Sequence, residues 1–191
     1  MTHDVMALLG DTTLTWTQRR TRLQGWRGSE AEQADAAAGA QRLGPALCAV
    51  GATAGALMGS PVVLAATGAT ALAGTFSATH PFESLYNRWA ASWHRQQLPG
   101  NRAAKRLGCA IGVIFLGGAA VAFWVGASAL GLVLGLILGC TAAFVAVTGI
   151  CVPSLLFTLL WGAERAAAPS LAAAARTGRA PTGRAPTGTR S

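Results

Sequence analysis

Two long stretches of this 191-residue chain carry no charged side chain. The first lies between Arg42 and Glu83 and holds 40 residues, and the second lies between Arg106 and Glu164 and holds 57. Moving a charge into hydrocarbon costs about 2.5 to 3.5 kcal/mol, so such gaps are typical of a chain that meets lipid. A helix needs roughly 20 residues to cross a membrane, which gives each gap room for two spans. The pattern predicts an all-α, polytopic membrane helical bundle with four transmembrane helices.

Breaks inside the apolar runs predict where each span ends. Gly59-Ser60-Pro61 divides the first gap, because proline cannot continue a helix without losing a hydrogen bond. A second proline, Pro153, ends the last span. The predicted segments are a cytoplasmic N-terminal segment over 1–42, a membrane domain over 43–162 with spans at about 43–58, 62–77, 107–127 and 130–148 and a half-length segment at 155–162, and a disordered basic tail over 163–191.

The positions of the basic residues predict how the chain is threaded. With four spans, residues 1–42, 78–108 and 163–191 share one side of the membrane, and all 15 lysines and arginines lie in them. The opposite connections, 59–61 and 126–130, carry no charge. Because basic residues stay on the cytoplasmic side, both termini and the central loop are expected in the cytoplasm. The expected location is the plasma (inner) membrane of a bacterium.

Residues 81–95 are predicted to form an amphipathic helix at the cytoplasmic interface. Large apolar side chains recur there at offsets of 0, 3, 4, 7 and 11, which is one face of a helix. Pro81 suits a first helical turn, and Glu83 suits the positive end of the helix dipole. Arginines on the other face favour a helix that lies in the interface plane. The residues expected to face inward are Phe82, Leu85, Tyr86, Trp89 and Trp93.

Glycines recur at every fourth position on the first and fourth predicted spans. Small residues at this spacing let helix backbones approach closely. Packing within one chain is the main interpretation, and contact with a second copy of the chain is the alternative. The predicted helix-packing residues are Gly51, Gly55 and Gly59 in the first span, and Gly131, Gly135 and Gly139 in the fourth.

Three cysteines, Cys48, Cys109 and Cys151, fall near the cytoplasmic ends of the predicted spans, whereas Cys140 lies deeper. The third and fourth spans are antiparallel neighbours, so Cys109 and Cys151 are expected to approach each other. A disulfide between them would need Cα atoms within about 7 Å. The alternative for all four is that they are small packing residues.

His80 is the third candidate reactive residue, beside Cys109 and Cys151. It precedes Pro81 at the cytoplasmic interface, where it could influence a nearby thiol. Arg106 and Lys105, next to the third span, would favour a thiolate at Cys109, whereas burial in apolar surroundings would oppose it. The alternative role for His80 is simply to cap a helix.

Several classes of function are disfavoured by composition. The net charge of +8 flanks the apolar runs, which indicates membrane topology rather than a nucleic-acid partner. The cysteines have no metal-ligand spacing, so neither a metal nor a cofactor is predicted. The spans contain no ionisable residue of the kind that proton and ion pathways use.

Short motifs follow one another along the membrane region: Gly59-Ser60-Pro61, His80-Pro81-Phe82 with Leu85-Tyr86-Asn87, Leu98-Pro99, a basic stretch at 102–106 before Cys109, and Cys151-Val152-Pro153-Ser154. Over roughly residues 40–162 they resemble a family of small bacterial integral-membrane proteins that is catalogued only as a domain of unknown function. The resemblance implies a multi-pass membrane protein. It supplies no activity, cofactor or catalytic residue, although some members are linked loosely to thiol or sulfur chemistry.

Three functions remain open. A non-catalytic membrane module fits every feature and is the leading interpretation, so an enzyme is less favoured. A thiol-dependent redox or sulfur-handling protein would use Cys109 and Cys151. A small-solute channel or carrier is the third. The expected partners are the lipid bilayer together with other membrane subunits, a second copy of the chain, or a cytoplasmic thiol protein.

Overall fold

The computed structural model of the chain describes residues 11–23, 26, 28–77, 80–93, 98 and 103–161, and every regular element within these ranges is helical. The predicted tail at 163–191 lies outside the described residues. The helices are α2 (Trp16–Leu23), α3 (Gly28–Ala36), the 3-10 turn η1 (Ala40–Arg42), α4 (Leu43–Leu57), α5 (Pro61–Phe76), α6 (Pro81–Ser92), α7 (Ala103–Trp124), α8 (Ser128–Thr148) and α9 (Val152–Trp161).

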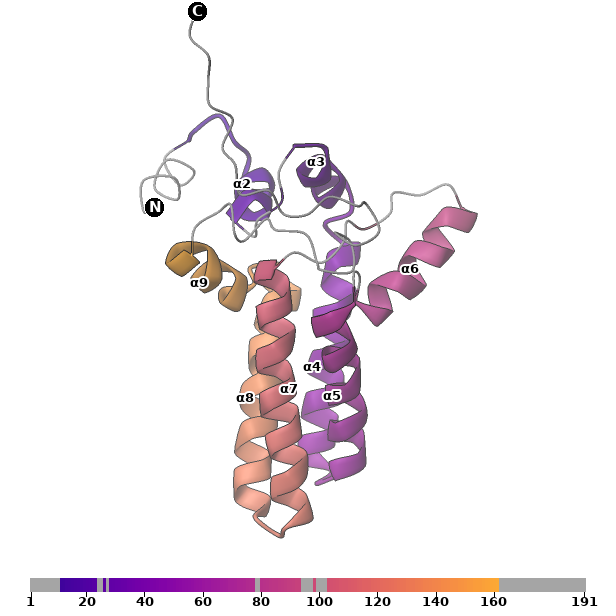
Figure 1. The fold of residues 1–191 in the computed structure, drawn as a ribbon, viewed down its shortest axis with the longest axis vertical. Coiled ribbons are helices and arrows are strands. Elements are labelled where there is room, and N and C mark those ends of the chain that lie inside the picture. The colour runs from indigo at the N-terminus through magenta and orange to yellow at the C-terminus, as the bar shows by residue number, and fades with distance from the viewer. Residues whose placement is uncertain are drawn as a thin grey trace, which may run out of the picture.

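Four helices, α4, α5, α7 and α8, run side by side as an antiparallel bundle (Figure 1). The helices pack in a ring, α4 against α5, α5 against α7, α7 against α8, and α8 back against α4. Two tight turns close one end, which we call the turn end. Gly59 makes the first turn at φ +58°, and Gly126 makes the second at φ +83°. Ser60 then caps α5 by accepting a hydrogen bond from Val63 N at 3.4 Å.

The interior of the bundle is made of small residues and its surface of large apolar ones. The central cluster joins Ala52, Leu64, Leu116, Ala119 and Ala120. Val62, Val147 and Ile114 are at least 70% exposed. This arrangement is the reverse of a soluble bundle, and it is typical of helices that pack through small residues while lipid covers the rest.

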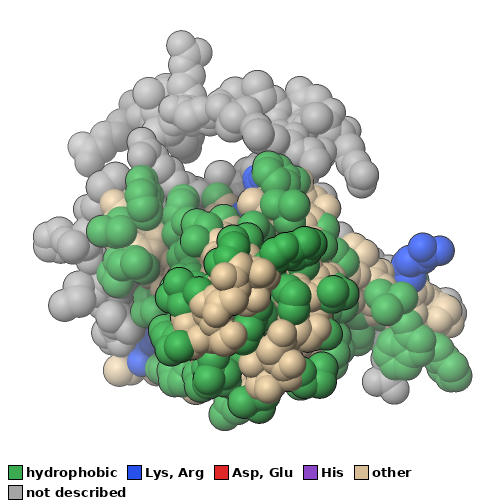
Figure 2. Space-filling model, turned by 90° about the horizontal axis from the view of Figure 1, so that it is seen from below, with side chains coloured by type: hydrophobic (Ala, Val, Ile, Leu, Met, Phe, Trp, Pro, Cys, Tyr) green, Lys and Arg blue, Asp and Glu red, His purple; other side chains and the backbone are tan. Residues whose placement is uncertain are grey.

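The remaining helices gather at the opposite end of the bundle, which we call the charged end. There α2 and α3 lie over the bundle, while α6 and α9 point outward on opposite sides (Figure 1). Seen from the turn end, the described bundle surface is hydrophobic or uncharged, and basic side chains show only at its margins (Figure 2). Charge is thus segregated along the bundle axis.

Two described helices, α7 and α8, are long and apolar enough to cross a membrane, judged by length and composition. A third span results if α5 and α6, which are bent by 73° at the break between them, are counted as one. The helices α4 and α5 hold 15 and 16 residues. At 1.5 Å per residue each is shorter than the ~30 Å hydrocarbon core.

Candidate functional site

A cavity of about 170 Å³ lies at the charged end of the bundle, beneath the N-terminal segment. Every helix of the bundle contributes to its wall, and Arg20 and Trp26 contribute from the N-terminal segment above it. Three cysteines line this one cavity: Cys48 from α4, Cys109 from α7, and Cys151 from the link between α8 and α9. All four cysteines of the chain are free thiols.

Two glycines bring the thiols and the imidazole together. A Cβ atom added to Gly74 would lie 3.1 Å from Cys109 Sγ and would also collide with the ring of His80. A Cβ added to the neighbouring Gly108 would lie 3.4 Å from Cys151 Sγ. The His80 ring and the Cys109 thiol therefore lie together beside Gly74. The Cys151 thiol packs against Gly108, the residue before Cys109. Cys140 is exposed on α8 and does not line the cavity.

His80 is the N-cap residue of α6, and it is also a wall of the cavity. It is almost fully buried, and its Nδ1 atom has no hydrogen-bond partner within the described part of the chain. Burial lowers the pKa of His80, Lys105 lowers it further, and Glu83 opposes the shift. His80 is therefore neutral at neutral pH, which lets one ring nitrogen accept a proton.

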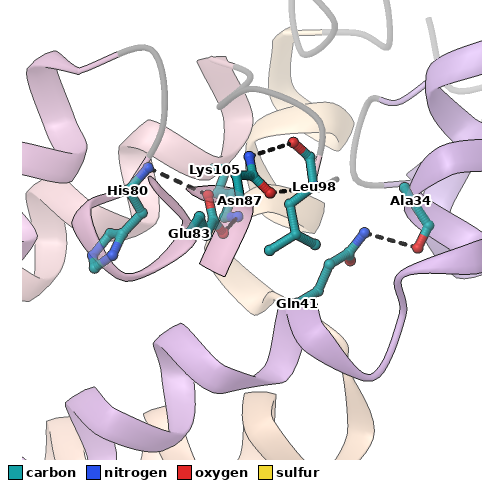
Figure 3. Close-up of polar contacts among 7 residues, drawn as sticks. All are labelled: Ala34, Gln41, His80, Glu83, Asn87, Leu98 and Lys105. Atoms are coloured by element: carbon teal, nitrogen blue, oxygen red, sulfur yellow. Dashed lines mark hydrogen bonds and ion pairs between the residues drawn. The ribbon is translucent and has the colours of Figure 1, made fainter. Parts of the chain in front are cut away.

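Glu83 and Lys105 form a buried ion pair beside the cavity (Figure 3). Only 3% of the Glu83 side chain and 19% of the Lys105 side chain are exposed. The second carboxylate oxygen of Glu83 accepts a hydrogen bond from the backbone N–H of His80 at 3.3 Å. Lys105 Nζ also lies 5.7 Å from the centre of the Trp26 ring, within cation–π range. Sequence reasoning missed this pair; the only signal was that Glu83 is the single acid among five basic residues in 78–108.

Two arginines hold the ends of helices at this level. Arg20 Nη1 donates to the carbonyl of Thr148 at 3.1 Å, and Arg106 Nε donates to the carbonyl of Thr75 at 2.5 Å. These carbonyls belong to the last turns of α8 and α5, where the helix dipole is negative. The contact made by Arg20 ties the N-terminal segment to the bundle. Sequence reasoning placed Arg20 only in the basic N-terminal segment and expected Arg106 to favour a thiolate at Cys109, so it predicted neither contact.

The glycines singled out by their spacing meet neighbouring helices of the same chain. A Cβ on Gly55 would lie 2.8 Å from Leu64 of α5, and one on Gly135 would lie 2.7 Å from the Cβ of Ala56 of α4. The remaining contacts are those of Gly51 with Thr67, Gly59 with Phe123, Gly131 with Phe123, and Gly139 with Thr53. Each of the six predicted helix-packing glycines thus has a close neighbour within the same chain.

The aromatic face of α6 lies outside the bundle core. Leu85, Trp89 and Trp93 are exposed, whereas Phe82 and Tyr86 are half-buried. The buried positions of α6 are Glu83 and Ala90. Four members of this face, with Leu43 and Leu47 of α4, line an apolar groove of about 330 Å³.

Asn87 of α6 forms two hydrogen bonds with the backbone of Leu98. Its amide nitrogen donates to the carbonyl of Leu98 at 3.0 Å, and its oxygen accepts from the N–H of Leu98 at 2.7 Å (Figure 3). On the other side of the charged end, Gln41 donates to the carbonyl of Ala34 at 2.9 Å. The bonds from Asn87 satisfy both backbone groups of Leu98, and the bond from Gln41 satisfies a carbonyl in the last turn of α3. Within the described residues, no three histidine, cysteine or acidic side chains are grouped as they would be around a metal ion.

The fold and the cavity define a class: an all-helical protein with apolar, membrane-type helices and a thiol-lined cavity at its charged end. A family model described as a domain of unknown function, DUF4395, matches residues 38–161. The chain belongs to this family. No curated protein and no solved structure matches the chain. The matched residues include all three cavity cysteines and His80, but they leave Arg20 and Trp26 outside.

Proposed function

We propose that the chain crosses a bacterial inner membrane four times, with both termini in the cytoplasm. The segregation of charge along the bundle supports this topology. The short helices α4 and α5 fit a bilayer that thins locally around them. Reporter fusions test it: a cytoplasm-dependent reporter after Ser191 should be active, and one inserted at Gly126 should be inactive. The reverse pattern would refute the topology.

We propose further that the protein is a thiol-dependent membrane protein, and that it exchanges electrons with a cytoplasmic dithiol protein. One observation carries the proposal: three free thiols and a buried imidazole line the same cavity. The reducing cytoplasm keeps the resting pair, Cys109 and Cys151, as thiols.

The exchange follows from the placement of the two thiols. Cys151 lies outside a helix, in the link before α9, so its thiolate attacks the disulfide of the oxidised partner. A mixed disulfide forms, and the partner's other sulfur leaves as a thiolate. Cys109 gives its proton to His80 and attacks Cys151, which releases the second sulfur of the partner. Two electrons pass to the partner, and a Cys109–Cys151 disulfide remains.

Trapping the mixed disulfide tests this proposal. In a Cys109→Ser variant the proposed resolving thiol is absent, so a covalent adduct with a cytoplasmic dithiol protein should accumulate on non-reducing gels. A Cys140→Ser variant is the matched control, because Cys140 does not line the cavity. Absence of any adduct in Cys109→Ser, together with unchanged alkylation of Cys109 in Cys151→Ser, would reject shared chemistry.

A second candidate is a non-catalytic module that packs against another membrane subunit. The apolar groove between α4 and α6 favours it, because Leu85 and Trp89 are large, apolar and exposed. A photoreactive side chain at Leu85 should then crosslink to protein, whereas one at Val147 on the exposed face of α8 should crosslink to lipid. Lipid adducts alone at both positions would contradict the module.

A further inference from the structure

We propose that the cavity at the charged end binds a small organic anion with an apolar body, under a roof made by the N-terminal segment. The roof consists of Arg20 and Trp26. This inference goes beyond thiol exchange and does not depend on it. It rests on an excess of positive charge, an unpaired buried donor, and an apolar lower wall.

Positive charge around the cavity exceeds negative charge. Arg20, Arg42 and Lys105 line it, whereas Glu83 is the single acid in its described wall, and Lys105 already engages that acid. Arg20 is buried, and its pKa is lowered by burial first and by the charge of Arg42 second. Asp35 offsets only part of that repulsion. An anion between the two guanidinium groups would relieve it.

Trp26 supplies the second, independent observation. Its side chain is 2% exposed, and within the described residues its indole N–H has no hydrogen-bond acceptor. Indole nitrogen can only donate, and leaving a buried donor unpaired costs free energy that a bound acceptor would recover. A carboxylate oxygen in the cavity is the acceptor that the adjoining cations also favour.

The lower wall sets the body of the ligand. Ile111, Leu116 and Leu138 close the cavity toward the bundle core. A cavity of about 170 Å³ is close to the roughly 150 Å³ that accommodates a benzene-sized molecule. The ligand is therefore a monocarboxylate with a short apolar chain or ring. The roof residues lie outside residues 38–161, so the site belongs to this chain and not to the matched domain alone.

Calorimetric titration of valerate into the full chain in nanodiscs tests the proposal, with empty nanodiscs as the blank. Pentanol is the matched neutral probe, because it has the same carbon chain without the charge. Valerate should bind saturably, and at least about 10-fold more tightly than pentanol, because charged hydrogen bonds hold it. No saturable heat with valerate, or equal binding of the two probes, would overturn the proposal.

Two pairs of variants locate the site. Trp26→Phe keeps the ring and removes only the N–H, so valerate should bind about 10-fold more weakly, whereas Trp16→Phe, at an exposed position, should bind it as the parent does. Arg42→Gln should also weaken binding, and Arg88→Gln, an exposed arginine outside the cavity, should not. Arg42 is exposed, so its variant tests the site even if Trp26→Phe fails to fold. Unchanged binding in Arg42→Gln would overturn the site.

A chain with Cys109→Ser and Cys151→Ser separates this site from thiol exchange. Valerate should bind to it as tightly as to the parent, although no exchange can occur. Binding that disappears with the thiols would overturn the independence of the anion site, while leaving the thiol proposal intact.

Discussion

The chain reverses its direction at both ends of the bundle, but different interactions hold the helix termini at each end. At the turn end, Gly59 and Gly126 reverse it within a few residues, using backbone conformations with positive φ and no charged group. At the charged end, the helix termini are held by side chains that come from far away in the sequence, such as Arg20 on Thr148. The turn end therefore depends on local backbone geometry, and the charged end depends on long-range electrostatics.

This difference between the two ends explains why the cavity lies at the charged end. Near the turn end the helices pack closely, since a Cβ added to Gly131 would lie 2.6 Å from the ring of Phe123. Long-range contacts at the charged end separate the helices enough to leave a cavity and bury polar groups beside it. Buried polar groups cost stability unless they are paired, so this end should be the more fragile one to mutate.

The largest loss is expected from Glu83→Gln. It leaves Lys105 without its carboxylate, and it should lower the free energy of unfolding by about 3 kcal/mol, the low end for a buried pair, because Lys105 keeps some exposure. Thermal unfolding in detergent measures it. Glu32→Gln, on the exposed side of α3, is the control. Adding Lys105→Met should restore part of the loss; no restoration would mean that the pair itself is not the cause.

Overpacking the bundle should have the next largest effect. In Gly135→Ala the new methyl group meets the Cβ of Ala56 at 2.7 Å, so α8 and α4 must move apart, at a cost of about 1 to 3 kcal/mol. Gly117→Ala is the matched control, because a Cβ there meets nothing within 4 Å. Equal unfolding midpoints for the two variants would show that the α4–α8 interface is loose.

A smaller effect is expected at the turn end. Gly126 has open space around it but a φ of +83°, so Gly126→Ala should cost only the backbone strain, about 1 kcal/mol. Gly126→Asn should cost less, since asparagine tolerates left-handed conformations. The same thermal unfolding measures both. A loss as large as that of Glu83→Gln would erase the proposed contrast between the two ends.

The smallest effect is a dependence on pH that vanishes at neutral pH. The pKa of His80 is lowered in the folded chain, so the unfolded chain takes up the proton first as the pH falls below the ordinary value of 6.5. The contribution of neutral His80 is present above that pH and is lost below it. Between pH 7.5 and pH 5.5, the parent chain should lose more stability than His80→Gln. Parallel profiles would show that His80 is not held neutral.

Sequence alone predicted the helical class well, for a local reason. Charge-free runs and the break at Pro61 act within one helix, so they can be recognised without knowing the fold. The predicted break at Pro153 was misplaced, because α8 ends at Gly149 with φ +70° and Pro153 lies in the first turn of α9. The start of α6 at Pro81 follows in the same way, from a proline and an acid in the first turn. Periodicity also gave the apolar face of α6. It could not tell whether that face meets protein, and Leu85 and Trp89 are in fact exposed.

The candidate site was predictable only in part. The convergence of Cys109 and Cys151 on one end followed from antiparallel spans, and both line the cavity together with His80. Cys48 was placed at the same end of the bundle but was not a candidate reactive residue. The sequence around it gives no sign that α4 faces α7 and α8 across a cavity. The bond between Arg20 and Thr148 joins residues 128 positions apart. No local pattern encodes a contact of that range.

The distance along the chain between Arg20 and Thr148 also limits the order in which parts of the protein can fold during synthesis. Arg20 leaves the ribosome long before Thr148, and at about 5 to 20 residues per second the delay is roughly 6 to 25 s. During this time α4 and α5 can already form their hairpin, while the roof has no carbonyl to hold. The cavity therefore closes only after α8 has been made, and a nascent chain that stops before α8 has Cys48 and Cys109 at an unfinished cavity wall.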